Sequence, residues 1–247
     1  MQPHIHLEES LGIPYAIMPG DPARVRRIAA CLEQTQELGS NREYRCISGT
    51  FRGVRILAVS TGMGGPSAAI AVEELRRTGV THMIRIGSCG ALRAGIRIGD
   101  LILAQAAVRD DGTSAAYVSP GYPAVSDAEM LFLCRKAAAE NGIVTHTGIV
   151  RSHDSFYVDE QDAINQYWSA RGVLGSDMET ATLLTVAGLR GVKALSILNN
   201  VVCWGSDTFD GIGAYSNGED AAAQGERASI LLALETLAAI DRKERQR

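Results

Sequence analysis

Three arginines and a serine stand close to the ends of strand-like stretches, where they could bind a small oxyanion. Arg24 lies one turn into the helix expected from Asp21, Arg85 lies in the apolar run "MIRIG", and Arg42 precedes another strand-like stretch. Ser88 adds a hydroxyl in a predicted Gly-Ser-Cys-Gly turn, and Gly20 adds an open backbone N–H. Guanidinium groups match the geometry of phosphate and keep their charge. These residues predict a site for inorganic phosphate or a phosphomonoester.

Arg85 is the most informative of these residues, because an arginine inside an apolar strand is costly to bury without a partner. Its partner is either a bound anion or an internal Asp or Glu, and the sequence leaves both open. The chain has no G-x-x-x-x-G-K-[ST] loop and no G-x-G-x-x-G motif, so nucleoside triphosphates and dinucleotides are poorly supported as ligands.

The stretch "STGMGGPSAAIAVEEL" (60–75) places three glycines between a strand-like run and a helix with Pro66 near its start. Glycine lets another group approach the main chain closely, and a helix start exposes unpaired N–H groups at the positive end of a dipole. The stretch therefore predicts that an anion or polar ligand meets the backbone here. A plain strand-to-helix turn is the alternative interpretation.

Two carboxylates in "SDMETATLL" (176–184), Asp177 and Glu179, precede an apolar helix. A carboxylate in this position could bind two neighbouring sugar hydroxyls, and Met178 could lie against an apolar sugar face. The alternatives are ordinary helix capping for the acids and core packing for the methionine.

Strand-like and helix-like patterns alternate along the chain. This alternation indicates a single fold that brings the separate segments together. Strands are expected at 15–20, 49–61, 81–87, 100–110, 145–155 and 193–203, and helices at 21–33, 66–79, 126–142, 177–191 and 218–246. This alternation predicts an α/β fold, with one domain over residues 1–247 and three α/β/α layers around a mixed, mainly parallel sheet. Ligands of such sheets bind beyond the carboxyl ends of the strands.

Composition excludes several classes of protein. The 46% hydrophobic content of 247 residues can form a large core, and the net charge of −4 argues against a nucleic-acid partner. No apolar run is long enough to cross a bilayer, so no membrane partner is expected. The start of the chain lacks the pattern of a signal peptide, and five scattered cysteines without a C-x-x-C indicate reduced thiols. We therefore expect a cytoplasmic protein.

The motifs together resemble the nucleoside phosphorylase family, which includes uridine phosphorylase and the hexameric purine nucleoside phosphorylases. The resemblance covers roughly the whole chain and is carried, in order, by "PGDPARV", "NREY", "STGMGGPSAAIAVEEL", "RIGSCGA", "AAVRDDG", "YPAV", "HDSFY" and "DMETATLL". It implies the family's fold and the reversible phosphorolysis of a ribo- or deoxyribonucleoside to a free base and a pentose 1-phosphate. Such an enzyme is a pentosyltransferase of nucleoside catabolism and salvage.

The resemblance also implies roles for individual residues. Phosphate is held by Gly20, Arg24, Arg85 and Ser88, with Arg42 reaching in from a neighbouring subunit. Ribose is held by Met178 and Glu179, and its 5′-hydroxyl by His6 across a dimer interface. His4 is the alternative to His6, and a mobile terminus is the structural alternative for both.

The base specificity is left open between uracil and purines. Phe156 and Gln161 would contact the base, and the apolar Val201 and Val202 favour a pyrimidine. The arginine that follows the glutamine in uridine phosphorylases is missing here, and Asp207 could act as a purine proton donor or be an ordinary loop residue. We expect uridine, with inosine or guanosine as the alternative.

No cofactor is expected besides phosphate as co-substrate, although Glu43 and Ser67 resemble residues that bind a monovalent cation such as K⁺ between subunits. The resemblance implies a hexamer built as a trimer of dimers. Two other functions remain possible from the sequence, a nucleosidase that uses water and a non-catalytic nucleoside-binding protein. The three arginines favour phosphorolysis over hydrolysis.

Overall fold

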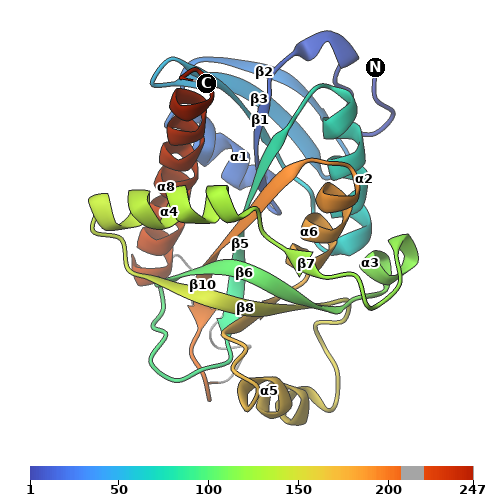
Figure 1. Ribbon diagram of the computed structural model, residues 1–247, viewed down its shortest axis with the longest axis vertical. Coiled ribbons are helices and arrows are strands. Elements are labelled where there is room, and N and C mark those ends of the chain that lie inside the picture. Colours follow the sequence, from blue (N-terminus) through green and yellow to red (C-terminus); the bar gives the residue numbers. More distant parts are fainter. Residues whose placement is uncertain (207–219, 247) are drawn as a thin grey trace.

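The centre of the molecule is a ten-stranded mixed sheet with strand order β10-β6-β8-β9-β5-β1-β4-β3-β2 and β7 paired to β6 (Figure 1). The computed structural model describes residues 1–206 and 220–246. The strands are β1 (Tyr15–Pro19), β2 (Glu33–Asn41), β3 (Tyr44–Phe51), β4 (Val54–Val59), β5 (His82–Ala91), β6 (Leu101–Asp110), β7 (Ala124–Val125), β8 (Thr145–His153), β9 (Gly175–Asp177) and β10 (Lys193–Val202).

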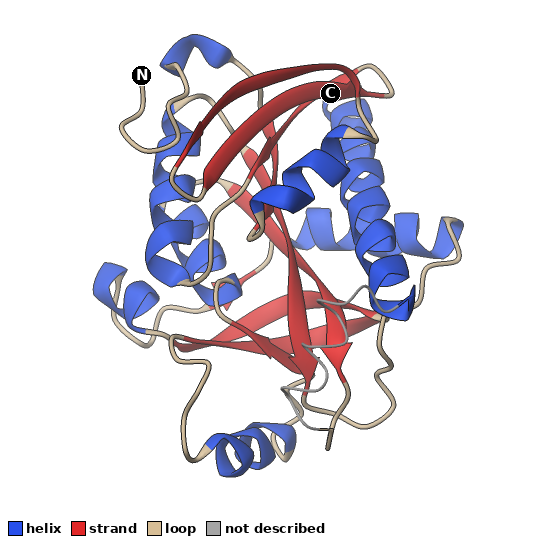
Figure 2. Cartoon of the chain, turned by 180° about the vertical axis from the view of Figure 1, so that it is seen from behind, coloured by secondary structure: helices blue, strands red, loops and turns tan. Residues whose placement is uncertain are grey.

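Helices cover both faces of this sheet, which confirms the predicted three layers (Figure 2). One apolar core packs under α2 (Gly65–Arg77) and α6 (Thr180–Leu189), beside the short α3 (Gly112–Tyr117). The other core packs under α1 (Pro22–Ala29), α4 (Ala128–Glu140) and α8 (Asp220–Glu244). A 3₁₀ helix (Glu9–Leu11) lies near the start, and α5 (Gln161–Ser169) lies apart at the lower end in Figure 1. In the described part, no helix is both long and apolar enough to span a membrane.

Part of the sheet closes into a ring, which the alternation of elements does not indicate. Strand β10 pairs with both β5 and β6, while β9 pairs with both β5 and β8. Side chains fill the inside of the ring, because a Cβ added at Gly175 of β9 would lie 2.8 Å from the Ile102 side chain of β6. The ring fixes the carboxyl ends of β5, β8 and β9 close together.

Several predicted boundaries are wrong for local reasons. The helix expected to reach residue 33 ends at Ala29, and the exposed edge strand β2 follows it. The sequence does not predict β2, because its polar residues show no apolar alternation. The helix expected from residue 177 begins at Thr180. Asp177 instead ends β9, and its carboxylate accepts a hydrogen bond from the Thr180 backbone N–H at 3.1 Å.

The segment before β1 is anchored to α2, contrary to the alternative of a mobile terminus. The buried carboxylate of Glu74 accepts hydrogen bonds from the backbone N–H groups of His4 (3.0 Å) and Ile5 (2.9 Å), and pairs with His4 Nδ1 at 2.6 Å. Asn41 Nδ2 donates to the His4 carbonyl at 2.9 Å. These contacts use His4 internally and leave His6 exposed, with a φ of 53°.

Replacing Glu74 by glutamine is expected to destabilise the fold at neutral pH by about 1–3 kcal/mol, because buried donors lose a charged acceptor. Burial alone would raise the pKa of Glu74, but the hydrogen bonds from Ile5 and His4 outweigh it and lower the pKa below its ordinary value of 4.5. A lowered pKa means that this stabilisation is complete above the ordinary value and is lost as pH falls below it. Thermal unfolding of both proteins at a series of pH values measures the difference.

Glu73→Gln is the matched control, since Glu73 is the preceding residue and pairs with Arg190 at the surface. It should change stability much less. A gap between the Glu74→Gln variant and the unmodified protein that stayed constant from pH 7 to below pH 4 would contradict the assignment.

Candidate active site

Arg85 lies at the centre of a buried ion-pair network near the carboxyl end of β5. Its side chain is 7% exposed; Nε donates to Asp177 Oδ2 at 3.0 Å and Nη2 donates to Glu179 Oε2 at 2.5 Å. Gly87 makes room for the guanidinium, because a Cβ there would lie 2.5 Å from Nη2. The sequence left open whether Arg85 pairs with an internal acid or with a bound anion, and the structure shows two internal carboxylates beside it. The contact of Arg85 with phosphate stays a prediction.

Glu179 connects Arg85 to the glycine-rich stretch. Its Oε1 accepts a hydrogen bond from the Gly64 backbone N–H at 2.6 Å, directly before α2. Gly64 has a φ of 95° and Gly62 a φ of 70°, which are conformations that favour glycine. The anion that meets the main chain at this helix start is the Glu179 carboxylate of the protein itself, and the contact of this stretch with a ligand stays a prediction.

The carboxylate of Glu179 is only partly compensated in this position. Burial raises the pKa of Glu179, Arg85 lowers it, and the nearby Asp177 raises it further, so that the pKa lies above its ordinary value. Arg85 shows the reverse balance, because burial alone would lower its pKa but Glu179 and Asp177 raise it. Hydroxyl donors placed against Glu179 would stabilise its charged form. The group is thus suited to binding sugar hydroxyls.

Arg24 and Ser88 form a second polar group on the other face of β5. Arg24 is 5% exposed; its Nη2 lies 3.4 Å from Ser88 Oγ, and its Nη1 donates to the Ile86 carbonyl at 3.2 Å. The predicted turn at Ser88 is wrong, because β5 continues to Ala91 by pairing with β10 and β9. Since side chains alternate along a strand, Arg85 and Ser88 point to opposite faces. The two arginines approach the strand end from opposite sides.

The loop that carries Gly20 meets the glycine-rich stretch. Gly62 N donates to the Gly20 carbonyl at 2.9 Å, and a Cβ at Gly20 would lie 3.0 Å from the Gly62 carbonyl oxygen. The predicted phosphate residues Gly20, Arg24 and Ser88 therefore lie in neighbouring segments. Their contact with phosphate remains a prediction.

Arg42 and Glu43 form the tight turn between β2 and β3, packed against the same stretch. A Cβ at Gly62 would lie 2.8 Å from Glu43 Cγ and 3.5 Å from Ser67 Oγ, so these two predicted cation residues flank Gly62. No cluster of three or more His, Cys, Asp or Glu suited to a metal occurs among residues 1–206 and 220–246. Arg42 has a φ of 53° and is exposed, and its predicted reach into the site of a neighbouring subunit stays a prediction.

The predicted base residues come from three different elements. Half-buried Phe156 follows β8 and packs edge to face on Tyr157, with ring centroids 4.9 Å apart. Gln161 opens α5 and donates from Nε2 to Asn165 Oδ1 at 2.8 Å. Val201 and Val202 are buried at the end of β10 against α8. Met178 is half-buried beside Glu179, and Asp207 lies outside the described residues.

Three residues that sequence reasoning missed hold the predicted ones in place. Ser152 donates from Oγ to Asp177 Oδ1 at 2.6 Å, and Thr180 Oγ1 donates to Asp177 Oδ2 at 2.6 Å. Glu226 of α8 accepts from Arg24 Nε at 2.8 Å and also pairs with Arg27. Thr180 follows Asp177 by only three residues, whereas Ser152 and Glu226 lie in distant segments and act through tertiary contact, which no sequence signal marks.

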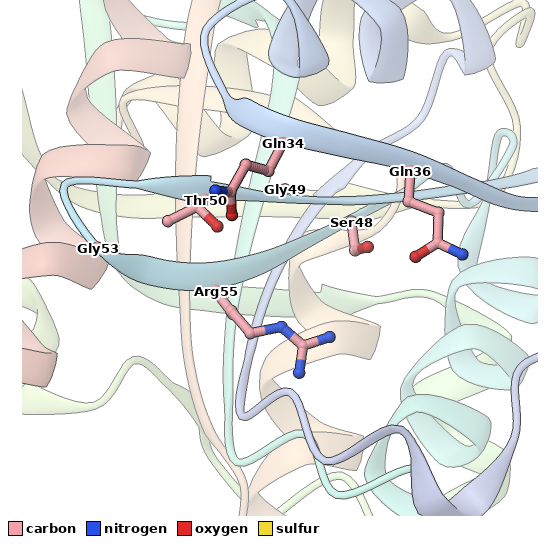
Figure 3. Close-up of a pocket in the computed structure, with 7 residues that line it drawn as sticks. All are labelled: Gln34, Gln36, Ser48, Gly49, Thr50, Gly53 and Arg55. Carbon is pink, nitrogen blue, oxygen red and sulfur yellow. The ribbon is translucent and has the colours of Figure 1, made fainter.

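A separate open hollow of about 310 Å³ lies on the hairpin sheet of β2, β3 and β4 (Figure 3). It holds none of the predicted site residues, and its lining is polar: Gln34, Gln36, Ser48, Gly49, Thr50, Gly53 and Arg55. The candidate active site is therefore placed by the convergence of segments at the end of β5 rather than by this hollow.

Comparison with known proteins agrees with this arrangement. The profile of the Phosphorylase superfamily matches residues 14–238. A uridine phosphorylase of Thermococcus kodakarensis is 43% identical over 206 residues, covering 78% of this chain and 74% of that protein. A guanosine phosphorylase of Halorubrum lacusprofundi is 41% identical over 196 residues, covering 79% of this chain and 81% of that protein.

A solved structure of uridine phosphorylase from Vibrio fischeri superposes with a TM-score of 0.90 at 45% identity and covers 96% of both chains. The superfamily profile spans every segment that contributes to the site at the end of β5, from Gly20 to Glu226. The chain therefore belongs to the phosphorylase superfamily and, within it, to the nucleoside phosphorylase family that its motifs resemble.

Proposed function

We propose that this protein catalyses the reversible phosphorolysis of uridine to uracil and ribose 1-phosphate. As a family member it is a pentosyltransferase, with inorganic phosphate as co-substrate. The observation that carries the choice of uridine is the similarity to uridine phosphorylases over nearly the whole chain. The apolar Val201 and Val202 at the end of β10 support the same choice, since a pyrimidine needs no acid at that position.

The residues proposed to bind phosphate and those proposed to bind ribose lie on opposite faces of β5. Gly20, Arg24 and Ser88 hold phosphate on one side, with Glu226 fixing the Arg24 guanidinium. Glu179, held by Arg85 and the Gly64 N–H, binds the ribose hydroxyls, and Met178 packs against the sugar. Arg85 reaches the phosphate from the opposite side of the strand end, and Arg42 and His6 extend to a neighbouring subunit. The exposure of Arg42 and His6 supports this role.

The chemistry that this arrangement supports is a displacement at the anomeric carbon. The bond from that carbon to the base nitrogen breaks, the electron pair leaves with the base, and a phosphate oxygen forms the new bond. The sugar carries positive charge during the exchange, and the phosphate anion and the Glu179 carboxylate stabilise it. Positioned charge of this kind supplies most of the rate enhancement.

Incubation with uridine, inosine, guanosine and cytidine, with and without phosphate, tests the proposal. Release of uracil that requires phosphate, together with stoichiometric ribose 1-phosphate, is the expected result. Equal release without phosphate would identify a nucleosidase, and binding without release would identify a non-catalytic nucleoside-binding protein.

A purine substrate is the second candidate, favoured by the similarity to a guanosine phosphorylase. In that case Asp207 would donate a proton to the leaving purine. Asp207→Asn would then reduce inosine or guanosine cleavage and spare uridine cleavage, whereas equal effects on both would assign the residue another role.

The assembly and setting follow from the same proposal. A single domain over residues 1–247 forms a hexamer as a trimer of dimers, in which Arg42 and His6 complete a neighbour's site. Glu43 and Ser67 beside Gly62 would bind a monovalent cation such as K⁺ between subunits. The enzyme would act in the cytoplasm in nucleoside salvage, since its cysteines are all free thiols.

A further inference from the structure

Arg151 of β8 is a buried arginine that is not among the predicted phosphate, ribose or base residues. Its side chain is 6% exposed, and Nε donates to Asp110 Oδ2 at 2.7 Å. Its Nη1 is fully buried and has no hydrogen-bond partner in the described structure. Asp110 is 46% exposed, so the ion pair lies at the edge of the buried region with the guanidinium on the inner side.

A buried donor that lacks an acceptor is costly, and a charged donor more so than a neutral one. An uncharged oxygen acceptor would satisfy Nη1 without adding a second carboxylate to a group already paired with Asp110. A ligand that brings a carbonyl oxygen to this place would therefore bind more tightly than one without it.

The strand register places Arg151 on the same face as Ser88, a predicted phosphate residue, and Val202, a predicted base residue. Arg151 pairs with Ser176 of β9, and Ser176 pairs with Gly90 of β5. Laterally paired residues share a face of a sheet, and Gly90 shares its face with Ser88 because it lies two positions along the strand. Val202 of β10 pairs with Gly90 on the far side.

The residues between Ser88 and Arg151 along this row are small. Gly90 has no side chain and Ser176 has a short one, so nothing bulky rises from β5 or β9 along this row. Two strand spacings separate the β5 and β8 backbones, about 10 Å. A planar base attached to a sugar at the end of β5 would project along this row toward β8.

Resting on the proposed function, we propose that Arg151 reads the base by donating a hydrogen bond from Nη1 to a carbonyl oxygen of the nucleobase. The site would then select oxo bases, uracil or an oxopurine, over cytosine and adenine, which present an amino group at the corresponding edge. This gives the chain a base-reading arginine from β8, although no arginine follows Gln161 in α5.

Replacing Arg151 by methionine, which keeps the length of the side chain without donors, tests the proposal. Steady-state kinetics are measured on uridine against cytidine and on inosine against adenosine at saturating phosphate. We expect kcat/KM for the oxo nucleoside to fall on the order of 10–100-fold, mainly through KM. The preference for the oxo nucleoside should fall by a similar factor, and the KM for phosphate should stay within twofold.

Arg151→Lys keeps the charge and the pairing with Asp110 but has a single nitrogen, so it should lose the same discrimination while retaining the fold. Arg171→Met is the matched control, because Arg171 is an exposed arginine that donates to the Tyr167 carbonyl outside the site. It should leave both kinetic ratios unchanged. Thermal unfolding of all variants separates loss of base reading from loss of structure.

One failure concerns the role of Arg151 alone. If the unmodified protein cleaves uridine with phosphate, and both Arg151 variants fold and keep its preference for oxo over amino nucleosides, the role of Arg151 is overturned and the proposed function stands. An unmodified protein that releases no base from any of the four nucleosides would overturn both. The two failures are therefore distinguishable.

Discussion

Replacing Arg85 by alanine is expected to lower kcat/KM for phosphorolysis by about 10²–10³-fold, comparable to the loss of one oxyanion donor in other enzymes. The guanidinium has two tasks in this structure, because it faces the strand end where phosphate is expected and it fixes Glu179 at 2.5 Å. Initial rates at varied uridine and varied phosphate measure the loss and divide it between the two substrates.

The same substitution also affects stability, since it leaves the buried carboxylates of Asp177 and Glu179 without their cation. Removing one partner of a buried pair costs about 3–5 kcal/mol. Arg85→Lys keeps a positive charge beside both carboxylates and lacks the fork, so it is the variant that separates folding from binding. Arg93→Ala, at an exposed position, is the surface control.

The division between substrates decides what Arg85 does. A raised KM for phosphate supports direct contact with the anion. A raised KM for uridine with an unchanged KM for phosphate would make Arg85 a positioning residue for Glu179. A folded Arg85→Lys variant with undiminished turnover would remove Arg85 from the site altogether.

Replacing Glu179 by glutamine is expected to reduce kcat/KM for uridine by roughly 10²-fold, because charged hydrogen bonds to two ribose hydroxyls are each worth about 1.5–3 kcal/mol. Glutamine keeps the shape of the side chain and an oxygen that can accept from the Gly64 N–H, which lies 2.6 Å from Glu179 Oε1 in the unmodified protein. Kinetics on uridine, 2′-deoxyuridine and 2′,3′-dideoxyuridine measure how much of the loss depends on the hydroxyls.

The expected loss shrinks with each hydroxyl removed and disappears for the dideoxy substrate. Glu140→Gln is the matched control, because Glu140 is an exposed carboxylate at the end of α4. An equal loss on all three substrates would show that Glu179 does not bind the sugar and acts instead through Arg85.

Much of the scaffold could be predicted from local patterns. Strand β1, helix α1 and helix α2 follow from an apolar run, an Asp-Pro start and a Gly-Pro start, all of which act within a few residues. The polar edge strand β2 and the short β9 could not be predicted, because their partners rather than their own sequences make them strands.

The sequence by itself determined the three layers, the glycine-rich turn with a proline start before α2, and the family of the chain. These depend on short-range periodicity and on motifs that read the same in any context. The tertiary structure decided that Arg85 pairs with Asp177 and Glu179, that Arg24 is held by Glu226, and that Arg151 shares a face of the sheet with Ser88 and Gly90. The physical reason is that charge compensation and side-chain facing arise between segments far apart in the chain, and the closed ring of strands brings those segments together.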